Sequence, residues 1–107
     1  MEIKKPAVAG TLESSDCQIT IRPNPGNGID IDLESDVKMM FGESILETVK
    51  KTLEEFGVTD AEVAIRDKGA LDCVIKSRMQ CVICRGAEEH YDWSKEDEKE
   101  WQKKQSV

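Results

Sequence analysis

Few side chains in this sequence of 107 residues are suited to acid–base or nucleophilic chemistry. The single histidine, His90, lies in a polar segment near the end of the chain. A Ser-His-Asp or Cys-His catalyst needs a histidine that is held rigidly beside its nucleophile, whereas a histidine in a charged tail is usually just a solvated side chain. The residue types therefore argue against an enzyme that works on its own.

Four cysteines, Cys17, Cys73, Cys81 and Cys84, are the next candidates. Cys81 and Cys84 have C-x-x-C spacing, and Cys73 and His90 would complete a set of four zinc ligands. The spacing between the pairs fits no known zinc module, and the segment has the pattern of a continuous helix. On such a helix Cys73 and Cys84 lie about 16 Å apart along the axis, on the side away from the apolar stripe, so they cannot share a metal or a disulfide. We expect free thiols, as in a reducing cytosol.

The third candidate is the segment Gly10-Thr-Leu-Glu-Ser-Ser-Asp16, in which Ser14 and Ser15 offer two adjacent hydroxyl groups. By composition this is a polar loop before a strand, and a serine pair in such a place is usually turn chemistry. Few apolar side chains anchor the segment, so we expect an exposed and mobile loop. A hydroxyl in such a loop is accessible to an enzyme that modifies it.

Three segments alternate apolar and polar side chains with the period of a β-strand, at residues 17–22, 29–33 and 62–66. The stretch 23–28 between the first two is rich in proline, asparagine and glycine, which predicts a turn and therefore a hairpin. The side chains predicted to face the core are Cys17, Ile19, Ile21, Ile29, Ile31, Leu33, Val63 and Ile65.

Two longer segments have the period of an amphipathic helix. The first begins at Val37 or as late as Gly42, after Ser35 or Asp36 as a possible cap, and ends at Gly57 with an apolar contact from Val58. The second runs from about residue 71 to 85 and ends at Gly86. The apolar faces of the two helices are formed by Val37, Phe41, Ile45, Leu46, Val49, Leu53 and Phe56 and by Leu71, Val74, Ile75, Met79, Val82 and Ile83.

The order strand–strand–helix–strand–helix predicts a small two-layer α+β domain. We expect about three strands in one sheet, with both amphipathic helices on one of its faces, and the strand between the helices can pair in parallel with a neighbour. We place this domain at residues 1–86. Residues 87–107 are mostly charged, with scattered Tyr91, Trp93 and Trp101, and are expected to form a flexible, loosely ordered tail.

The overall charge limits the classes of partner. A formal net charge of -7 and a pI of about 4.7 disfavour binding to nucleic acid, whose phosphates an acidic surface repels. Basic surfaces on partner proteins are the natural complement. No apolar run approaches the roughly 20 residues of a membrane span, and the N-terminus lacks an apolar signal core, so we expect a cytoplasmic protein that does not bind membranes.

Two segments resemble the signatures of a known family. Pro6-Ala-Val-Ala-Gly-Thr-Leu-Glu-Ser-Ser-Asp16 is similar to the N-terminal signature of citrate lyase acyl carrier proteins, the gamma subunits of that enzyme. Asp67-Lys-Gly-Ala-Leu-Asp-Cys73 is similar to the second signature of the same family, at the right distance downstream. The helix between them matches in position, including Phe41-Gly42. The resemblance covers residues 1–86, and the tail departs from the family.

The resemblance implies a specific modified residue. In this family the serine that follows Thr-Leu-Glu carries the prosthetic group, which in this chain is Ser14. The group implied is phosphoribosyl-dephospho-CoA, derived from triphosphoribosyl-dephospho-CoA and joined through a phosphodiester. Ser15 is adjacent and chemically equivalent, so the chemistry of the sequence does not exclude it. The Asp-Ser-Leu motif of ordinary acyl carriers does not occur in the sequence.

The resemblance also implies a role. The chain would be a non-catalytic acyl carrier subunit of citrate lyase, which carries acetyl and citryl thioesters while citrate is cleaved to acetate and oxaloacetate. The alpha subunit (acetyl/citrate transferase) and the beta subunit (citryl lyase) would catalyse the reactions in a hetero-oligomer, and any metal would belong to the beta subunit. A prosthetic-group transferase would load Ser14. Tethering gives the thioester an effective concentration of order millimolar at the partner sites.

Two alternatives remain open from the residues. The first is a non-enzymatic α+β module that only recruits partner proteins, and intact mass distinguishes it because a carrier gains mass on Ser14. The second is a metal or thiol-redox protein that uses Cys81 and Cys84, which metal analysis or thiol titration would reveal.

Overall fold

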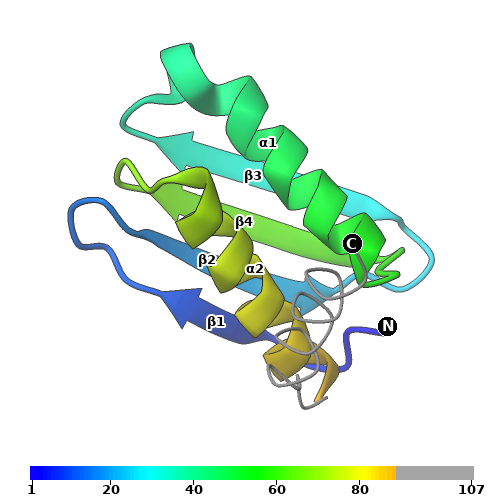
Figure 1. Ribbon diagram of the computed structural model, residues 1–107. Helices are drawn as coiled ribbons and strands as arrows, with labels where there is room; N and C mark the ends of the chain where they lie inside the picture. The colour runs from blue at the N-terminus through cyan, green and yellow to red at the C-terminus, as the bar shows by residue number, and fades with distance from the viewer. Residues whose placement is uncertain (89–107) are drawn as a thin grey trace, which may run out of the picture.

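The computed structural model describes residues 1–88, which form a four-stranded sheet covered on one face by two helices (Figure 1). This confirms the predicted two-layer α+β class. The tail beyond residue 88, with His90, Tyr91, Trp93 and Trp101, lies outside the described residues. The elements in chain order are β1 (Ala7–Gly10), β2 (Cys17–Pro23), β3 (Ile29–Ser35), α1 (Lys38–Glu55), β4 (Ala61–Asp67) and α2 (Asp72–Ala87).

The strand order β1-β2-β4-β3 differs from the predicted hairpin. β4 lies between β2 and β3, pairing antiparallel with β2 and parallel with β3, so the predicted parallel pairing is confirmed and the direct β2–β3 pairing is wrong. The Pro/Gly stretch does reverse the chain, but its end binds the start of β4: the Gly28 N–H donates to Asp60 Oδ1 (2.8 Å), and the Ala61 N–H donates to the Gly28 carbonyl (3.0 Å). These bonds place the start of β4 beside the start of β3.

β1 is an additional strand beyond the three that the alternation predicted. It is short and pairs antiparallel with β2, with Ala7 opposite Ile21 and Gly10 opposite Gln18. Its four residues are too few and too small to give a clear alternating pattern, which is why the alternation did not reveal this strand.

The core lies between the sheet and the helices. α2 contacts β1, β2 and α1, while α1 contacts β3 and α2. The alternating residues of β2 and β4 face this layer as predicted, and Val63 and Ile65 are buried with them. The largest fully buried side chains are Ile19, Ile21, Ile45, Leu53, Ile65, Ile75, Met79 and Ile83. Burial of a side chain of this size contributes about 1.5–3 kcal/mol, so this layer is the main stabilising part of the fold.

The C-terminal end of α1 confirms the predicted glycine cap. Gly57 has a φ of 65°, which places it in the left-handed region, and its N–H donates to the Glu54 carbonyl (3.0 Å). The N–H of buried Val58 donates to the Leu53 carbonyl (2.9 Å), which completes a Schellman motif. At the other end, the Ser35 hydroxyl accepts from the Val37 N–H (3.1 Å), just ahead of the first helical residue.

Gly86 does not end α2, contrary to the prediction. The helix continues to Ala87, and Glu88 follows in the left-handed conformation. A Cβ added at Gly86 would come too close to the side chains of Ile21 and Ile3. The Gly86 carbonyl accepts the N–H groups of Lys4 (2.8 Å) and Lys5 (3.1 Å). Gly86 therefore allows the N-terminal segment to pack closely against the helix.

Four residues differ in exposure from the predicted faces. Phe41, Leu71 and Ile29 were assigned to the core but are exposed, and Cys84 was assigned to the outer side of its helix but is buried. Phe41 and Leu71 lie in or just before the first turns of their helices, and Ile29 begins its strand, so all three lie at the ends of elements. α2 packs against β1 and β2 as well as α1, and therefore buries a wider arc than one apolar stripe.

None of the helices within residues 1–88 is both long enough and apolar enough to cross a bilayer.

Candidate functional site

The two segments that resemble family signatures lie at the same end of the sheet. The β1–β2, β3–α1 and β4–α2 connections are all at this end, as Figure 1 shows. We call residues 11–16 the serine loop and residues 67–70 the aspartate turn. The sequence placed both in loops but gave no sign that they touch.

Gly10 allows the serine loop to begin as a tight continuation of the β1–β2 ladder. Its φ of 88° favours glycine, and a Cβ at this position would collide with the carbonyl oxygen of Cys17. That same carbonyl accepts the Thr11 N–H (3.2 Å). Only glycine permits this close approach of the two strands, which explains a glycine before Thr-Leu-Glu-Ser.

Ser14 and Ser15 occupy the centre of a four-residue turn. The Asp16 N–H donates to the Glu13 carbonyl (3.2 Å), and Ser15 has a φ of 65°. A positive φ at the third residue is characteristic of type II turns and normally favours glycine or asparagine. Both serines are exposed, as predicted, and in residues 1–88 neither hydroxyl makes a hydrogen bond.

Asp16 fastens the C-terminal side of the serine loop. Its carboxylate accepts a bidentate pair from Arg78, Nε to Oδ1 at 3.1 Å and Nη2 to Oδ2 at 2.9 Å. It also accepts the Thr11 hydroxyl (2.7 Å) and the Cys17 N–H (2.7 Å). Because Thr11 Oγ1 in turn accepts the Glu13 N–H (3.2 Å), both sides of the loop are joined through one carboxylate.

These contacts set the ionisation of the pair. Hydrogen bonds from Arg78 and Thr11 hold the pKa of Asp16 well below its usual range, and the hydrogen bond with Asp16 raises the pKa of Arg78. The side chain of Asp16 is only 15% exposed, so the pair is not a freely solvated surface contact. It remains charged throughout the physiological pH range.

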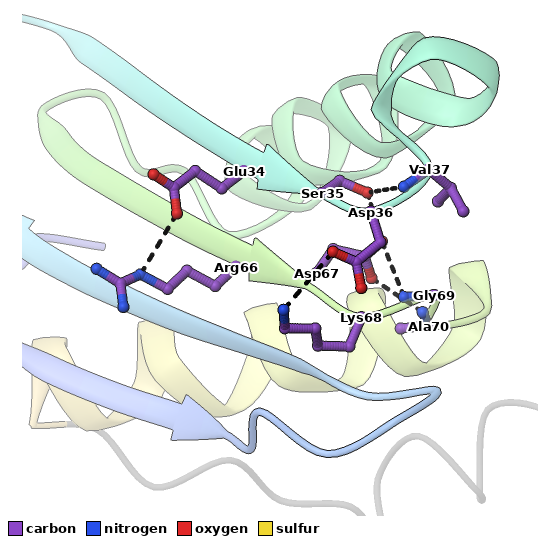
Figure 2. A network of polar contacts seen from close by, with 9 residues as sticks. All are labelled: Glu34, Ser35, Asp36, Val37, Arg66, Asp67, Lys68, Gly69 and Ala70. Carbon is purple, nitrogen blue, oxygen red and sulfur yellow. Dashed lines mark hydrogen bonds and ion pairs between the residues drawn. The ribbon is translucent and has the colours of Figure 1, made fainter.

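The aspartate turn is organised by Asp67, whose side chain is buried at the end of β4. Its carboxylate accepts the Ala70 N–H (2.9 Å), the Gly69 N–H (3.2 Å) and the Ser35 hydroxyl (2.8 Å), as Figure 2 shows in part. Gly69 has a φ of 85°, which the turn requires and glycine provides. Asp67 therefore links β4 to the end of β3 and turns the chain into α2.

The ion pairs of Figure 2 are weaker additions. Lys68 Nζ lies 3.6 Å from Asp36 Oδ1, and Arg66 Nε lies 3.8 Å from Glu34 Oε2. All four side chains are exposed to solvent by 42% or more, and pairs in such surroundings contribute about 0–1 kcal/mol.

The serine loop rests directly on the aspartate turn. The Ser15 N–H donates to the Lys68 carbonyl (2.8 Å), and the Lys68 N–H donates to the Asp16 carbonyl (2.9 Å). This pair of backbone bonds connects residues more than fifty positions apart in the sequence. The second signature thus acts as the support on which the serine turn is held.

Two features of this site were not predicted. The loop has few apolar anchors, as expected, but polar contacts hold both sides of the turn. The two serine hydroxyls remain exposed outside these contacts. Arg78 gave no signal in the sequence, because it is one charged residue on a helix 62 positions away from its partner.

The cysteines do not gather into a site. Cys17 is buried below the serine loop, Cys73 is exposed, Cys81 is half-buried and Cys84 is buried. Burial raises the pKa of Cys17 to about 11, helped by the nearby carboxylates of Asp16 and Asp67. None of the four cysteines forms a disulfide, and in the described part of the chain no three histidine, cysteine or acidic residues are grouped to hold a metal.

Comparison with known proteins places this arrangement in a family. The model of the acyl carrier family described as the malonate decarboxylase delta subunit matches residues 4–86. A citrate lyase acyl carrier protein of Clostridium perfringens is 50% identical over 94 residues, which is 87% of this chain and 93% of the relative. One from Lactobacillus helveticus is 54% identical over 88 residues, covering 82% and 90% of the two chains.

A solved structure has the same fold. It is a chain in the crystal structure of a Pseudomonas malonate decarboxylase hetero-tetramer in complex with malonate, with a TM-score of 0.53 and 19% identity, covering 82% of this chain and 90% of that one. At this identity the likeness concerns the fold. Because the chain is 50% identical to a citrate lyase acyl carrier protein over 87% of its length, and the family model matches residues 4–86, it belongs to this family of acyl carrier proteins.

Proposed function

We propose that this chain is the acyl carrier subunit of a citrate lyase and that Ser14 carries a phosphoribosyl-dephospho-CoA group through a phosphodiester. A member of this family is a carrier, so the catalytic groups belong to other subunits. The observation that carries the proposal is an exposed Ser14 hydroxyl that makes no hydrogen bond within residues 1–88, at the centre of a turn that Asp16 and Lys68 hold in place.

The site fits attachment of a bulky group through an oxygen atom. The Ser14 hydroxyl projects from the end of the sheet rather than into the core, so a substituent displaces no packed side chain. In the loading reaction the Ser14 oxygen attacks a phosphorus of triphosphoribosyl-dephospho-CoA, pyrophosphate leaves, and the serine proton passes to a base. We assign that base to the transferase, because within residues 1–88 no side chain hydrogen-bonds the hydroxyl.

Ser14 is favoured over Ser15 by the backbone. Ser15 has the positive φ, and its N–H donates to the Lys68 carbonyl. Its backbone is therefore held against the aspartate turn. Ser14 precedes this anchored residue and has neither constraint.

The residues of this chain hold the attachment point while the partners act on the thioester. When bound, the group supplies a terminal thiol that carries acetyl and citryl groups. The serine turn is kept in one conformation by Gly10, Asp16 and Arg78. This lowers the entropy cost of positioning the attached group in a partner active site. The proposed partners are the alpha subunit, the beta subunit and the prosthetic-group transferase, within a cytoplasmic hetero-oligomer.

Peptide mass spectrometry of the native complex tests the proposal. We expect the peptide that contains Ser14 to carry the mass of the group, and Ser14→Ala to give a folded subunit with no group and no citrate cleavage in the reconstituted complex. A bare peptide in a complex that still cleaves citrate would contradict it.

Ser15→Gly is the matched control. Glycine accepts the positive φ, which costs other residues about 1–2 kcal/mol, so this variant should be at least as stable as the parent. It should also be loaded normally. Loss of the group in Ser15→Gly together with normal loading of Ser14→Ala would assign the attachment to Ser15 instead.

A further inference from the structure

Two exposed apolar side chains lie together at the same end of the sheet as the serine loop. They are Phe41 in the first turn of α1 and Leu71 just before α2, which line one hollow and which we call the end patch. Their exposed fractions are 51% and 70%. Both are large apolar side chains that the fold leaves in solvent.

The end patch borders a hollow. Phe41 and Leu71 line an open cavity of about 340 Å³, together with Val37, Ala70 and Asp72. The cavity is mostly apolar at its floor, where Ile45 is buried, and Asp72 provides an acidic edge. A single large apolar side chain from another protein would fit a hollow of this kind.

The backbone connects this hollow to the modification site. Lys68 accepts the Ser15 N–H, and the next residues, Gly69, Ala70 and Leu71, form one side of the hollow. Three residues span at most about 11 Å, so the end patch and the serine loop fall within one protein contact surface. Any protein whose active site receives a group attached at Ser14 has to approach this end of the molecule.

The residue types suit repeated docking. Met39 and Met40 are also exposed in the first turn of α1, and methionine side chains are flexible and frequent on surfaces that bind several partners. The exposed acids around the patch are Asp36, Glu43 and Asp72, and the exposed bases are Lys38 and Lys68, of which Lys68 is paired with Asp36. With a formal net charge of -7 on the whole chain, a partner with an apolar centre and a basic rim is complementary.

We infer that the end patch is the docking surface for a catalytic subunit of the complex, with an apolar side chain of that subunit seated between Phe41 and Leu71. The inference rests on the proposed carrier function, because it takes its partner from there. It extends that function by assigning recognition to α1 and the aspartate turn, away from the serine itself.

Binding of the full-length chain to the separately purified alpha and beta subunits of its own citrate lyase tests the inference. Leu71→Ser and Phe41→Ser, each prepared without the prosthetic group, should bind at least one subunit about tenfold more weakly, as expected for large central side chains of an interface. Serine is a favourable N-cap residue, so Leu71→Ser should not unfold the chain. Ile29→Ser, which removes an exposed apolar side chain at the opposite end of the sheet, should change the affinity less than twofold.

Three results would overturn the inference. Unchanged affinity of both patch variants for both subunits would exclude docking there. A loss seen only in chains that carry the group would mean that the patch holds the arm. A concentration-dependent dimer of the parent that Leu71→Ser abolishes would mean that a second copy covers the patch. The unmodified chain binds through protein contacts alone, so a bare Ser14 in the native complex would refute the carrier site without affecting this test.

Discussion

Arg78, in the middle of α2, reaches back to Asp16 at the base of the serine turn and binds both carboxylate oxygens, at 3.1 Å and 2.9 Å. The geometry is that of a planar guanidinium matched to a carboxylate, which fixes orientation as well as distance. A helix of the rigid layer thus determines where the exposed serine stands.

Replacement of Arg78 by glutamine should loosen the serine turn. We expect a loss of about 1–2 kcal/mol in the free energy of unfolding, since a hydrogen-bonded charge loses its partner but the arginine side chain is 39% exposed. The rate at which the transferase loads Ser14 should also fall. Urea titration and a loading assay followed by intact mass measure the two effects.

Arg66→Gln is the control for the Arg78 variant. Arg66 forms an exposed ion pair with Glu34 on the same sheet, so its loss should change the free energy of unfolding by less than about 0.5 kcal/mol and leave loading unchanged. Equal effects of the two substitutions would contradict a special role for the Arg78–Asp16 pair.

Acid should weaken the fold through Asp16. Its folded pKa lies well below its usual range, so the unfolded chain binds a proton more readily than the folded one. The stabilisation is therefore complete above the unfolded pKa of about 4 and declines as the pH falls below it toward the lower folded value. We expect the free energy of unfolding to fall more steeply between pH 4 and pH 2 in the parent than in Asp16→Asn. Parallel pH curves for the two proteins would contradict this account.

Gly10→Ala should disrupt the start of the serine loop. The added Cβ collides with the Cys17 carbonyl, and alanine at this position would have to adopt a positive φ. The substitution therefore introduces both a collision and backbone strain. Gly26→Ala separates the two effects, because Gly26 also has a positive φ (74°) but no atom of residues 1–88 lies within 4 Å of an added Cβ. We expect Gly26→Ala to cost about 1–2 kcal/mol and Gly10→Ala clearly more, in thermal or urea unfolding. Equal losses of stability in the two variants would mean that the collision at Gly10 is relieved at no cost in the free energy of unfolding.

The thiols should react in the order of their exposure. Cys73 is exposed and should be alkylated first by N-ethylmaleimide at neutral pH, whereas Cys17 is buried with a pKa of about 11 and should react only on unfolding. Mass spectrometry of peptides after timed labelling measures the order. Rapid labelling of Cys17 in the folded chain would show that the packing beneath the serine loop opens.

The fold class was accessible from the sequence because its signals are local. Alternation in residues 17–22 and 62–66 and the helical period of Ile45, Val49 and Leu53 reflect which side chains avoid water, and the structure buries them as predicted. The cap at Gly57 was equally local. The two signatures also indicated the family and the segment that contains Ser14.

Only the tertiary structure determined the strand order and the support of the serine loop. A turn signal predicts that the chain reverses, but it does not exclude a later strand from the space between β2 and β3. β4 lies between these two strands, where Asp60 and Ala61 hydrogen-bond Gly28. In the same way, the contact of Arg78 with Asp16 depends on how α2 lies over β1 and β2. Each of these contacts joins residues far apart in the chain, and periodicity carries no information about such pairs.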